Sequence, residues 1–270
     1  MGLEYKEVKC PNCGAPIKLK SALRSKVVIC EYCNAEISLE GDIGIKVGER
    51  TRHEYPTRLA VKLGQIASFE GKRFELVGRI VYEFDDDEDI DYWEEFLFLA
   101  DDGEYIWLEC DCDGFTKYRE LRPKKPINPR TLRPGQSIEL DDKKGTVKEI
   151  GPAKIAFFEG ELTWKVKLDS SVMYVDIEFT NGETGSIEYT DKELEFFIGR
   201  SISRKTVYEA LGIKYIPPKK DTKSGIMFVV IVIIIIVLCC LFSKFGGGTS
   251  SSSGIRTSSP SNSFSSSGGK

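Results

Sequence analysis

Four cysteines near the N-terminus have the spacing of a metal site. Cys10 and Cys13 form one Cys-x2-Cys pair, Cys30 and Cys33 form a second, and sixteen residues separate the two pairs. Two residues between paired thiolates make a tight turn that points both sulfurs at one ion, and two such turns complete a tetrahedron. This spacing falls within the pattern of structural zinc sites, so we predict that the four cysteines bind zinc.

The predicted site is closed to catalysis, because four protein thiolates leave no coordination position for a reactive water. A redox dithiol and a rubredoxin-like iron site remain open as alternatives. Gly14 and Asn34 follow the two pairs, and both residue types accept the positive φ that such turns need. Between the pairs, Ile17–Leu19 and Lys26–Ile29 are expected to form a small hairpin, which makes residues 1–40 a zinc ribbon.

The sequence offers no recognisable catalytic grouping. His53 is the single histidine, so histidine-based acid–base or triad chemistry has little support. No phosphate-binding glycine loop is present. We therefore assign no catalytic and no cofactor-binding residues. An enzyme of unknown reaction remains an alternative, because four acidic residues could pair across strands: Glu94, Glu95, Glu161 and Asp176.

Two further motifs are interpreted as structural. Cys110 and Cys112 alternate with other residues on an expected strand, which favours packing in the core. The acidic run Asp85–Asp91 lacks the alternating ligands and the glycine of a calcium loop. We expect it to form a solvated hairpin tip.

The middle of the chain, residues 56–202, has the pattern of an antiparallel β domain. Apolar residues alternate at period two along several segments, and turn sequences such as Asn181-Gly182 separate these segments. The expected strands include Phe74–Phe84, Ile106–Cys112, Leu162–Leu168 and Met173–Phe179. Ser203–Leu211 has helical spacing, with Ser203 as the cap and Gly212 as the stop. The fold class is therefore mainly β.

A faint internal repeat suggests two related small β units within this domain. Residues 64–78 read GQIASFEGKRFELVG, and residues 135–151 read GQSIELDDKKGTVKEIG. Both begin with Gly-Gln and continue into further strands. Duplication would explain this, and chance similarity of two strand–turn–strand openings is the alternative.

An uncharged segment near the C-terminus predicts a transmembrane helix. Ile226–Phe242 reads IMFVVIVIIIIVLCCLF, and the twenty residues 224–243 can cross a hydrocarbon core of roughly 30 Å as one helix. Basic residues are more frequent before this segment than after it, and the positive-inside rule then places the N-terminal head in the cytoplasm. The tail lies outside. Thiols stay reduced in the cytoplasm, which agrees with metal binding.

The remaining segments connect these regions. Residues 41–55 are a linker, residues 203–223 combine the short helix with a basic juxtamembrane stretch, and residues 244–270 form a Gly/Ser-rich tail that we expect to be disordered. The formal net charge of the chain is −4. This argues against a large basic surface for nucleic acid.

The middle region resembles the DUF4178 family, a bacterial domain of unknown function. The segments that carry the likeness are Gly64–Glu83, Tyr92–Leu99, Tyr105–Leu108, Ala153–Trp164, Tyr174–Asp176 and Glu195–Gly199. The family usually has proline before the tryptophan of the Gly-Glu-Leu-x-Trp segment, where this chain has Thr163. The resemblance implies a β-rich fold and a bacterial envelope setting, often with a zinc ribbon or a membrane span. It supplies no catalytic residues.

These observations together predict a non-catalytic binding or scaffold protein of the bacterial inner membrane, anchored by a single span. Its expected partners are the lipid bilayer and a protein near the membrane. Nucleic-acid binding through the ribbon is an alternative, because the segment between the cysteine pairs is basic, with Lys18, Lys20, Arg24 and Lys26. The sequence does not indicate the ligand, the oligomeric state or the physiological signal.

Overall fold

The computed structural model describes residues 6–20, 24–40, 43–49, 55–86 and 89–217. Met1–Ile216 forms one compact unit. The predicted transmembrane segment 224–243, the predicted tail and His53 lie outside the described residues. In the part of the chain that the structure describes, no helix has the length and apolar character needed to cross a membrane.

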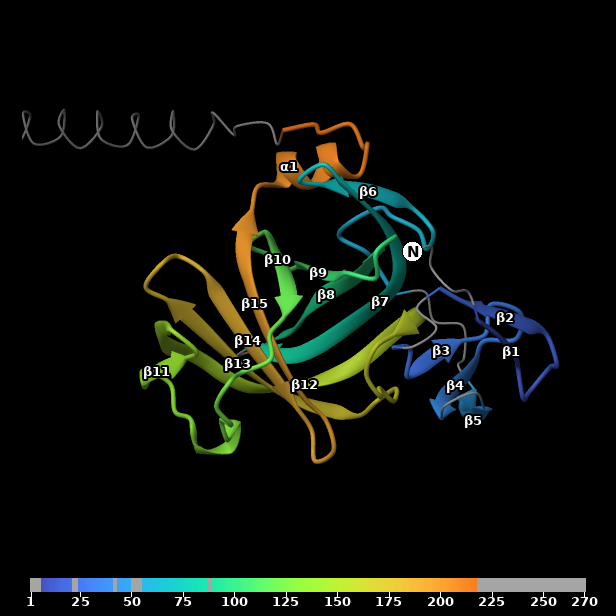
Figure 1. The fold of residues 1–270 in the computed structure, drawn as a ribbon, viewed down its shortest axis with the longest axis horizontal. Helices are drawn as coiled ribbons and strands as arrows, with labels where there is room; N and C mark the ends of the chain where they lie inside the picture. The colour runs from blue at the N-terminus through green and yellow to red at the C-terminus, as the bar shows by residue number, and fades with distance from the viewer. Residues whose placement is uncertain (1–5, 21–23, 41–42, 50–54, 87–88, 218–270) are drawn as a thin grey trace, which may run out of the picture. The chain divides into compact units, whose positions relative to one another are not determined.

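Antiparallel strands make up most of the described chain, as predicted (Figure 1). The strands of the N-terminal ribbon are β1 (Lys6–Lys9), β2 (Pro16–Leu19), β3 (Val27–Ile29), β4 (Ala35–Glu40) and β5 (Ile43–Glu49). The next five are β6 (Ile66–Phe69), β7 (Lys72–Asp86), β8 (Asp89–Ala100), β9 (Tyr105–Cys110) and β10 (Phe115–Glu120). The last five are β11 (Ser137–Leu140), β12 (Lys143–Leu162), β13 (Ser171–Phe179), β14 (Thr184–Tyr189) and β15 (Leu194–Ile202). A 3-10 helix, η1 (Pro129–Thr131), precedes β11, and α1 (Arg204–Ala210) follows β15.

Eight of these strands close into a ring. The hydrogen-bonded order is β12-β13-β14-β15-β10-β9-β8-β7, and β7 pairs again with β12 to complete the circuit. We call these eight strands the ring. Its closure satisfies backbone groups that would otherwise lie at open sheet edges.

Glycine allows β7 and β12 to approach closely where the ring closes. Gly78 on β7 pairs with Gly160 on β12. A Cβ atom at Gly78 would lie 2.1 Å from the carbonyl oxygen of Glu161, so any larger residue there would force the two strands apart.

The two halves of the ring have the same local geometry at their starts. In the first half, Gly64 N–H donates to Leu76 O at 2.8 Å, and its φ is +82°. In the second half, Gly135 N–H donates to Val147 O at 2.8 Å, and its φ is +80°. Equivalent strands also pair across the halves, β7 with β12 and β10 with β15. This geometry supports two related β units.

Three apolar clusters stabilise the ring and its surroundings. One cluster joins residues from both halves, such as Leu97 and Phe197, and therefore marks the inner face of the ring. The other two lie on the opposite face of each half, and one of them includes Val207 of α1. A fourth cluster forms the centre of the ribbon.

Three local predictions are corrected by the structure. The segments 17–19 and 26–29 do not form a hairpin with each other, because β2 pairs with β1, and β3 pairs with β4 and β12. Residues 163–168 are not a strand, although Trp164 and Val166 are buried against the inner cluster. Cys112 lies after the end of β9 in an exposed turn, whereas Cys110 is buried as predicted.

Other local predictions are confirmed. Helix α1 begins after Ser203, whose side chain accepts a hydrogen bond from Thr206 N–H, and Gly212 follows it with a φ of +67°. Strands β7 and β8 pair as far as Asp86 and Asp89, so the acidic run extends across a hairpin.

Candidate functional site

The four cysteines cluster in the ribbon with the geometry of a metal site. All four sulfur atoms lie within 4.8 Å of one another. Cys10 Sγ lies 3.6 Å from Cys33 Sγ, and Cys13 Sγ lies 3.9 Å from Cys30 Sγ. Metal–sulfur bonds of about 2.3 Å in a tetrahedron give edges of about 3.8 Å, whereas a disulfide requires a sulfur–sulfur distance of about 2.05 Å. The arrangement therefore fits one metal ion, and the identity of that metal stays a prediction.

Matching turns position the two cysteine pairs. Gly14 N–H donates to Cys10 O at 2.9 Å, and Asn34 N–H donates to Cys30 O at 2.8 Å. The φ angles of Gly14 and Asn34 are +77° and +56°, which confirms the expectation that both positions need a residue tolerant of positive φ.

The local environment favours a thiolate at Cys33 in particular. Asn12 Nδ2 donates to Cys33 Sγ at 3.5 Å, and this contact lowers the pKa of Cys33 to about 6. Burial raises the pKa of Cys30 to about 12. A bound cation would favour the thiolate form of both residues.

The ribbon is joined to the ring through β12. Glu161 and Leu162, at the end of β12, pair with Val28 and Val27 of β3. The buried carboxylate of Glu161 accepts hydrogen bonds from Lys20 N–H at 2.7 Å and from Ser25 Oγ at 2.8 Å. Glu161 therefore connects two modules and does not face the other acidic residues that the sequence singled out.

Glu94 also has a structural role. Its side chain is fully buried and forms an ion pair with Arg79 at 2.8 Å. Thr57 Oγ1 donates to the same carboxylate at 2.9 Å, and Arg58 N–H donates to it as well. These hydrogen bonds hold Thr57 and Arg58, which precede the first strand of the ring, against Glu94 of β8.

Glu95 and Asp176, in contrast, line one pocket at the inner face of the ring. The cavity has a volume of about 210 Å³. Its lining consists of seven acidic residues, three aromatic residues, a cysteine and a serine: Glu95, Glu109, Asp111, Asp113, Glu149, Asp176, Glu188, Phe84, Trp93, Tyr174, Cys112 and Ser186. We call this cavity the acidic pocket. No lysine, arginine or histidine is among these described lining residues.

The acidic pocket holds its carboxyl groups in an unfavourable environment. Burial, followed by repulsion from Glu188 and Glu109, raises the pKa of Glu95 well above its ordinary value. Burial raises the pKa of Glu188 to about 7, although the Tyr82 hydroxyl donates a hydrogen bond to this carboxylate at 3.1 Å. Burial likewise raises the pKa of Asp176 to about 7. The sequence analysis did not predict that Glu109 and Glu188 would share a pocket with Glu95 and Asp176.

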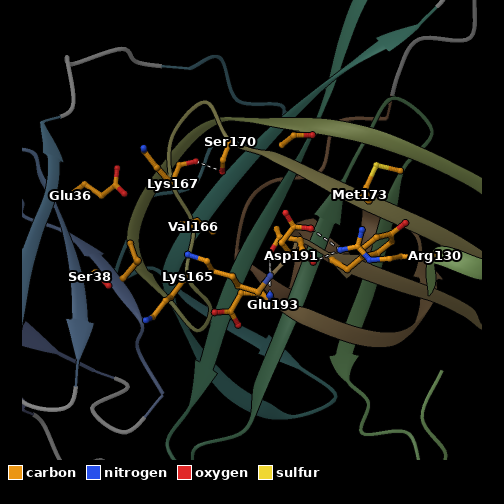
Figure 2. A pocket seen from close by; sticks show the side chains of 15 residues that line it. Glu36, Ser38, Arg130, Lys165, Val166, Lys167, Ser170, Met173, Asp191 and Glu193 are labelled. Carbon is orange, nitrogen blue, oxygen red and sulfur yellow. Dashed lines mark hydrogen bonds and ion pairs between the residues drawn. The ribbon is translucent and has the colours of Figure 1, made fainter. Parts of the chain in front are cut away.

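A second cavity lies between the ribbon and the ring (Figure 2). Its volume is about 530 Å³. Glu36 and Ser38 of β4 line one side, and the segment from Lys165 to Met173 and the turn from Tyr189 to Glu193 line others. Arg130 and Asp191 form an ion pair at 2.8 Å at its edge. We call this cavity the groove.

One oxygen atom in the groove has no partner among the described residues. Glu36 is 6 % exposed, and its Oε1 accepts no hydrogen bond. Burial raises the pKa of this carboxyl group. A buried acceptor without a donor is costly, so a ligand that donates a hydrogen bond here would relieve that cost.

A comparison with protein families decides the classification. The family model described as "Domain of unknown function (DUF4178)" matches residues 62–204, which is just over half of the chain. The chain belongs to the DUF4178 family. Within this DUF4178 domain lie the whole ring and the acidic pocket, whereas the cysteine cluster precedes the matched region. No curated protein and no solved structure matches the chain.

Proposed function

We propose that this DUF4178 protein is a membrane-anchored, non-catalytic binding protein of the bacterial inner membrane. Its head, residues 1–216, lies on the cytoplasmic side and carries a structural zinc ion on Cys10, Cys13, Cys30 and Cys33. The observation that carries the proposal is the groove, because two separate modules build it and leave a buried acceptor, Glu36 Oε1, without a donor.

The chemistry of the groove suits a segment of a partner protein. Its lining carries charges of both signs: the basic residues include Lys165, Lys167 and Lys192, and the acidic residues include Glu36 and Glu193. A peptide backbone or an amide side chain supplies the hydrogen-bond donor that Glu36 lacks.

The ribbon supports this function by fixing one wall of the groove. The metal site sets the positions of β3 and β4, and Glu161 ties the ribbon to β12. Zinc is the proposed metal because four thiolates in a tetrahedron suit this ion. The anchor is the apolar segment 224–243, and the basic residues before it support a cytoplasmic head.

Site-directed photocrosslinking tests partner binding in the groove. A photoreactive amino acid replaces Ser171, an exposed groove residue, and in a matched control it replaces Ser137, an exposed residue of β11 outside the groove. We expect the full-length chain in cells to give one discrete protein adduct from position 171 and none from position 137. Equal labelling from both positions, or no adduct from either, would contradict the proposal.

Membrane fractionation tests the anchor separately. The full-length chain is expected to remain in the membrane pellet after an alkaline carbonate wash, and a chain ending at Ile216 is expected to be released. Recovery of the full-length chain in the supernatant without detergent would contradict the anchored arrangement.

The enzyme alternative is kept as a second candidate because Glu95 and Asp176 share one pocket. If it is correct, incubation of the wild-type chain with a metabolite extract changes the composition of the extract, and the Asp176→Asn variant does not. In the nucleic-acid alternative, Lys20 and Arg24 would exchange their present partners, Glu75 and Glu120, for phosphate groups.

A further inference from the structure

The acidic pocket brings many carboxyl groups together, and its described lining supplies no cation to neutralise them. Seven of its twelve lining residues are acidic, and none of the described lining residues is basic. Two pairs of glutamates even face each other directly across strands at this end of the ring: Glu95 pairs with Glu109, and Glu188 pairs with Glu195. Like charges at opposed positions of a sheet are destabilising. Such an arrangement therefore needs either protons or a cation.

A second feature of the pocket also indicates a missing ligand. Ser186 of β14 is 7 % exposed as a residue and lines the cavity, and no described residue forms a hydrogen bond with its hydroxyl. The hydroxyl oxygen is not among the fully buried unpaired atoms, so it is accessible from the cavity. The Ser186 hydroxyl is thus available to a molecule inside the cavity.

Aromatic side chains form the walls beside the carboxylates. Trp93 stacks on Tyr82 with ring centroids 4.7 Å apart, and Tyr174 meets Trp93 edge-on at 5.4 Å. Trp93 Nε1 donates to Glu95 Oε1 at 3.1 Å, which fixes the position of that carboxylate. Aromatic faces next to carboxylates are the combination that recognises organic ammonium groups.

The spacing of the carboxylates argues against a metal ion. Among the described residues, only the four cysteines bring three or more ligand atoms close enough to hold one ion. The carboxylates of the pocket instead surround a cavity of about 210 Å³. This volume is below the roughly 300–1,000 Å³ of pockets for drug-sized ligands, so the occupant is small.

From these observations we propose that the acidic pocket binds a small organic ammonium ion. Glu95, Glu109, Asp176 and Glu188 supply the negative charge and accept hydrogen bonds from the ammonium group. Trp93 and Tyr174 contact its aliphatic part. The Ser186 hydroxyl accepts or donates one further hydrogen bond. The site is independent of the groove, which lies against the ribbon and has a different lining.

Calorimetric titration of the full-length chain at pH 8 tests the proposal. The probes are n-butylammonium, 1,4-diammoniobutane and tetramethylammonium, and the controls are 1-butanol and magnesium chloride at matched ionic strength. We expect saturable binding of at least one ammonium probe with one site per chain, and no saturable binding of butanol or magnesium. Magnesium binding in place of the ammonium probes, or no binding at millimolar concentrations, would overturn the proposal.

Variants locate the binding site. Hydrogen bonds to charged groups contribute about 1.5–3 kcal/mol each, so the double variant Glu95→Gln/Glu109→Gln is expected to weaken binding by about tenfold or more. Glu139→Gln removes an exposed charge on β11, outside the pocket, and should leave binding unchanged. If the double variant does not fold, Asp113→Asn at the exposed rim should weaken binding by a smaller factor. Equal affinities in the pocket variants and Glu139→Gln would contradict the assignment.

Discussion

The ribbon brings four thiols together and the ring brings seven carboxyl groups together, but the spacing within the two groups differs. The four thiols of the ribbon lie within 4.8 Å of one another, close enough to share one metal ion. The carboxyl groups of the ring surround a cavity of about 210 Å³. The comparison teaches that spacing, and not only charge, separates a site for a metal ion from a site for a larger cation.

Glu94 and Glu95 are neighbours on β8, but only Glu94 has a cationic partner. Adjacent residues of β8 point to opposite faces of the sheet. Glu94 meets Arg79 and two further donors, so its charge is neutralised by the protein itself. Glu95 faces Glu109 and Glu188 and receives a hydrogen bond from Trp93. Buried charge on one face holds the fold together, and buried charge on the other is left for a ligand.

Removing the metal should produce the largest effect. Structural zinc provides about 10–16 kcal/mol of apparent binding free energy in zinc-finger peptides, so chelation or Cys30→Ser should unfold the ribbon locally. Hydrogen exchange should accelerate strongly in β1, β2 and β3 and stay slow in β13 and β14. Unchanged exchange in the ribbon after complete metal removal would show that the cysteines are not structural ligands.

Removing the ion pair between Glu94 of β8 and Arg79 should have the next largest effect on the free energy of unfolding. Glu94→Ala removes the buried ion pair of Arg79, which keeps only the more distant carboxylate of Glu159 at 3.8 Å, and such losses cost about 3–5 kcal/mol. The matched control is Glu178→Ala, which breaks the exposed pair with Lys148 and should cost less than about 1 kcal/mol. Chemical denaturation of both variants measures the difference, and similar free energies of unfolding for the two would contradict a structural role for Glu94.

Stability should decrease as the pH rises, because of the acidic pocket. The pKa values of Glu188 and Asp176 are raised to about 7 in the folded chain, so the folded state binds more protons than the unfolded state between about pH 4 and pH 7. The free energy of unfolding should therefore fall across this window by several kcal/mol.

The variant Glu95→Gln/Glu188→Gln tests this explanation. It removes the buried ionisable groups that face each other, so its free energy of unfolding should depend less on pH and should exceed that of the wild type at pH 8. Asp176, Glu109 and Glu195 still titrate near this site and account for the slope that remains. A slope equal to that of the wild type would show that the pH dependence arises elsewhere.

Detaching the ribbon from the ring should have a smaller effect. Glu161→Ala removes the carboxylate that accepts hydrogen bonds from the Lys20 N–H and the Ser25 hydroxyl, and the loss of hydrogen bonds to a charged group costs about 1.5–3 kcal/mol. Limited proteolysis should cleave the ribbon faster than in the wild type and leave the ring intact. The exposed change Glu139→Ala serves as the control, and equal cleavage rates in both variants would rule out this connection.

The sequence predicts the ribbon site well, because the chemistry is local. Two residues between cysteines, followed by Gly14 and Asn34, determine the turns and the direction of the sulfurs. The β class and helix α1 are equally visible in the period of their apolar residues. The prediction of a strand over residues 163–168 is wrong, since Trp164 and Val166 are buried without strand pairing.

The acidic pocket is harder to predict, because it depends on closure of the ring. Glu95, Asp176 and Glu188 come from β8, β13 and β14 and meet only when β7 pairs with β12. One local signal exists for Glu109. It alternates with Leu108 and Cys110 and therefore shares the face of Trp107, where a carboxylate among apolar residues is unusual.

Native mass spectrometry of the full-length chain, used to count bound metal ions, tests most directly whether the cysteine cluster binds a metal ion and the acidic pocket does not. The wild type and Glu95→Gln/Glu188→Gln should each carry one zinc ion per chain, and Cys30→Ser should carry none. A chain without metal, or a metal ion that is lost in the carboxylate variant and retained in Cys30→Ser, would contradict the account.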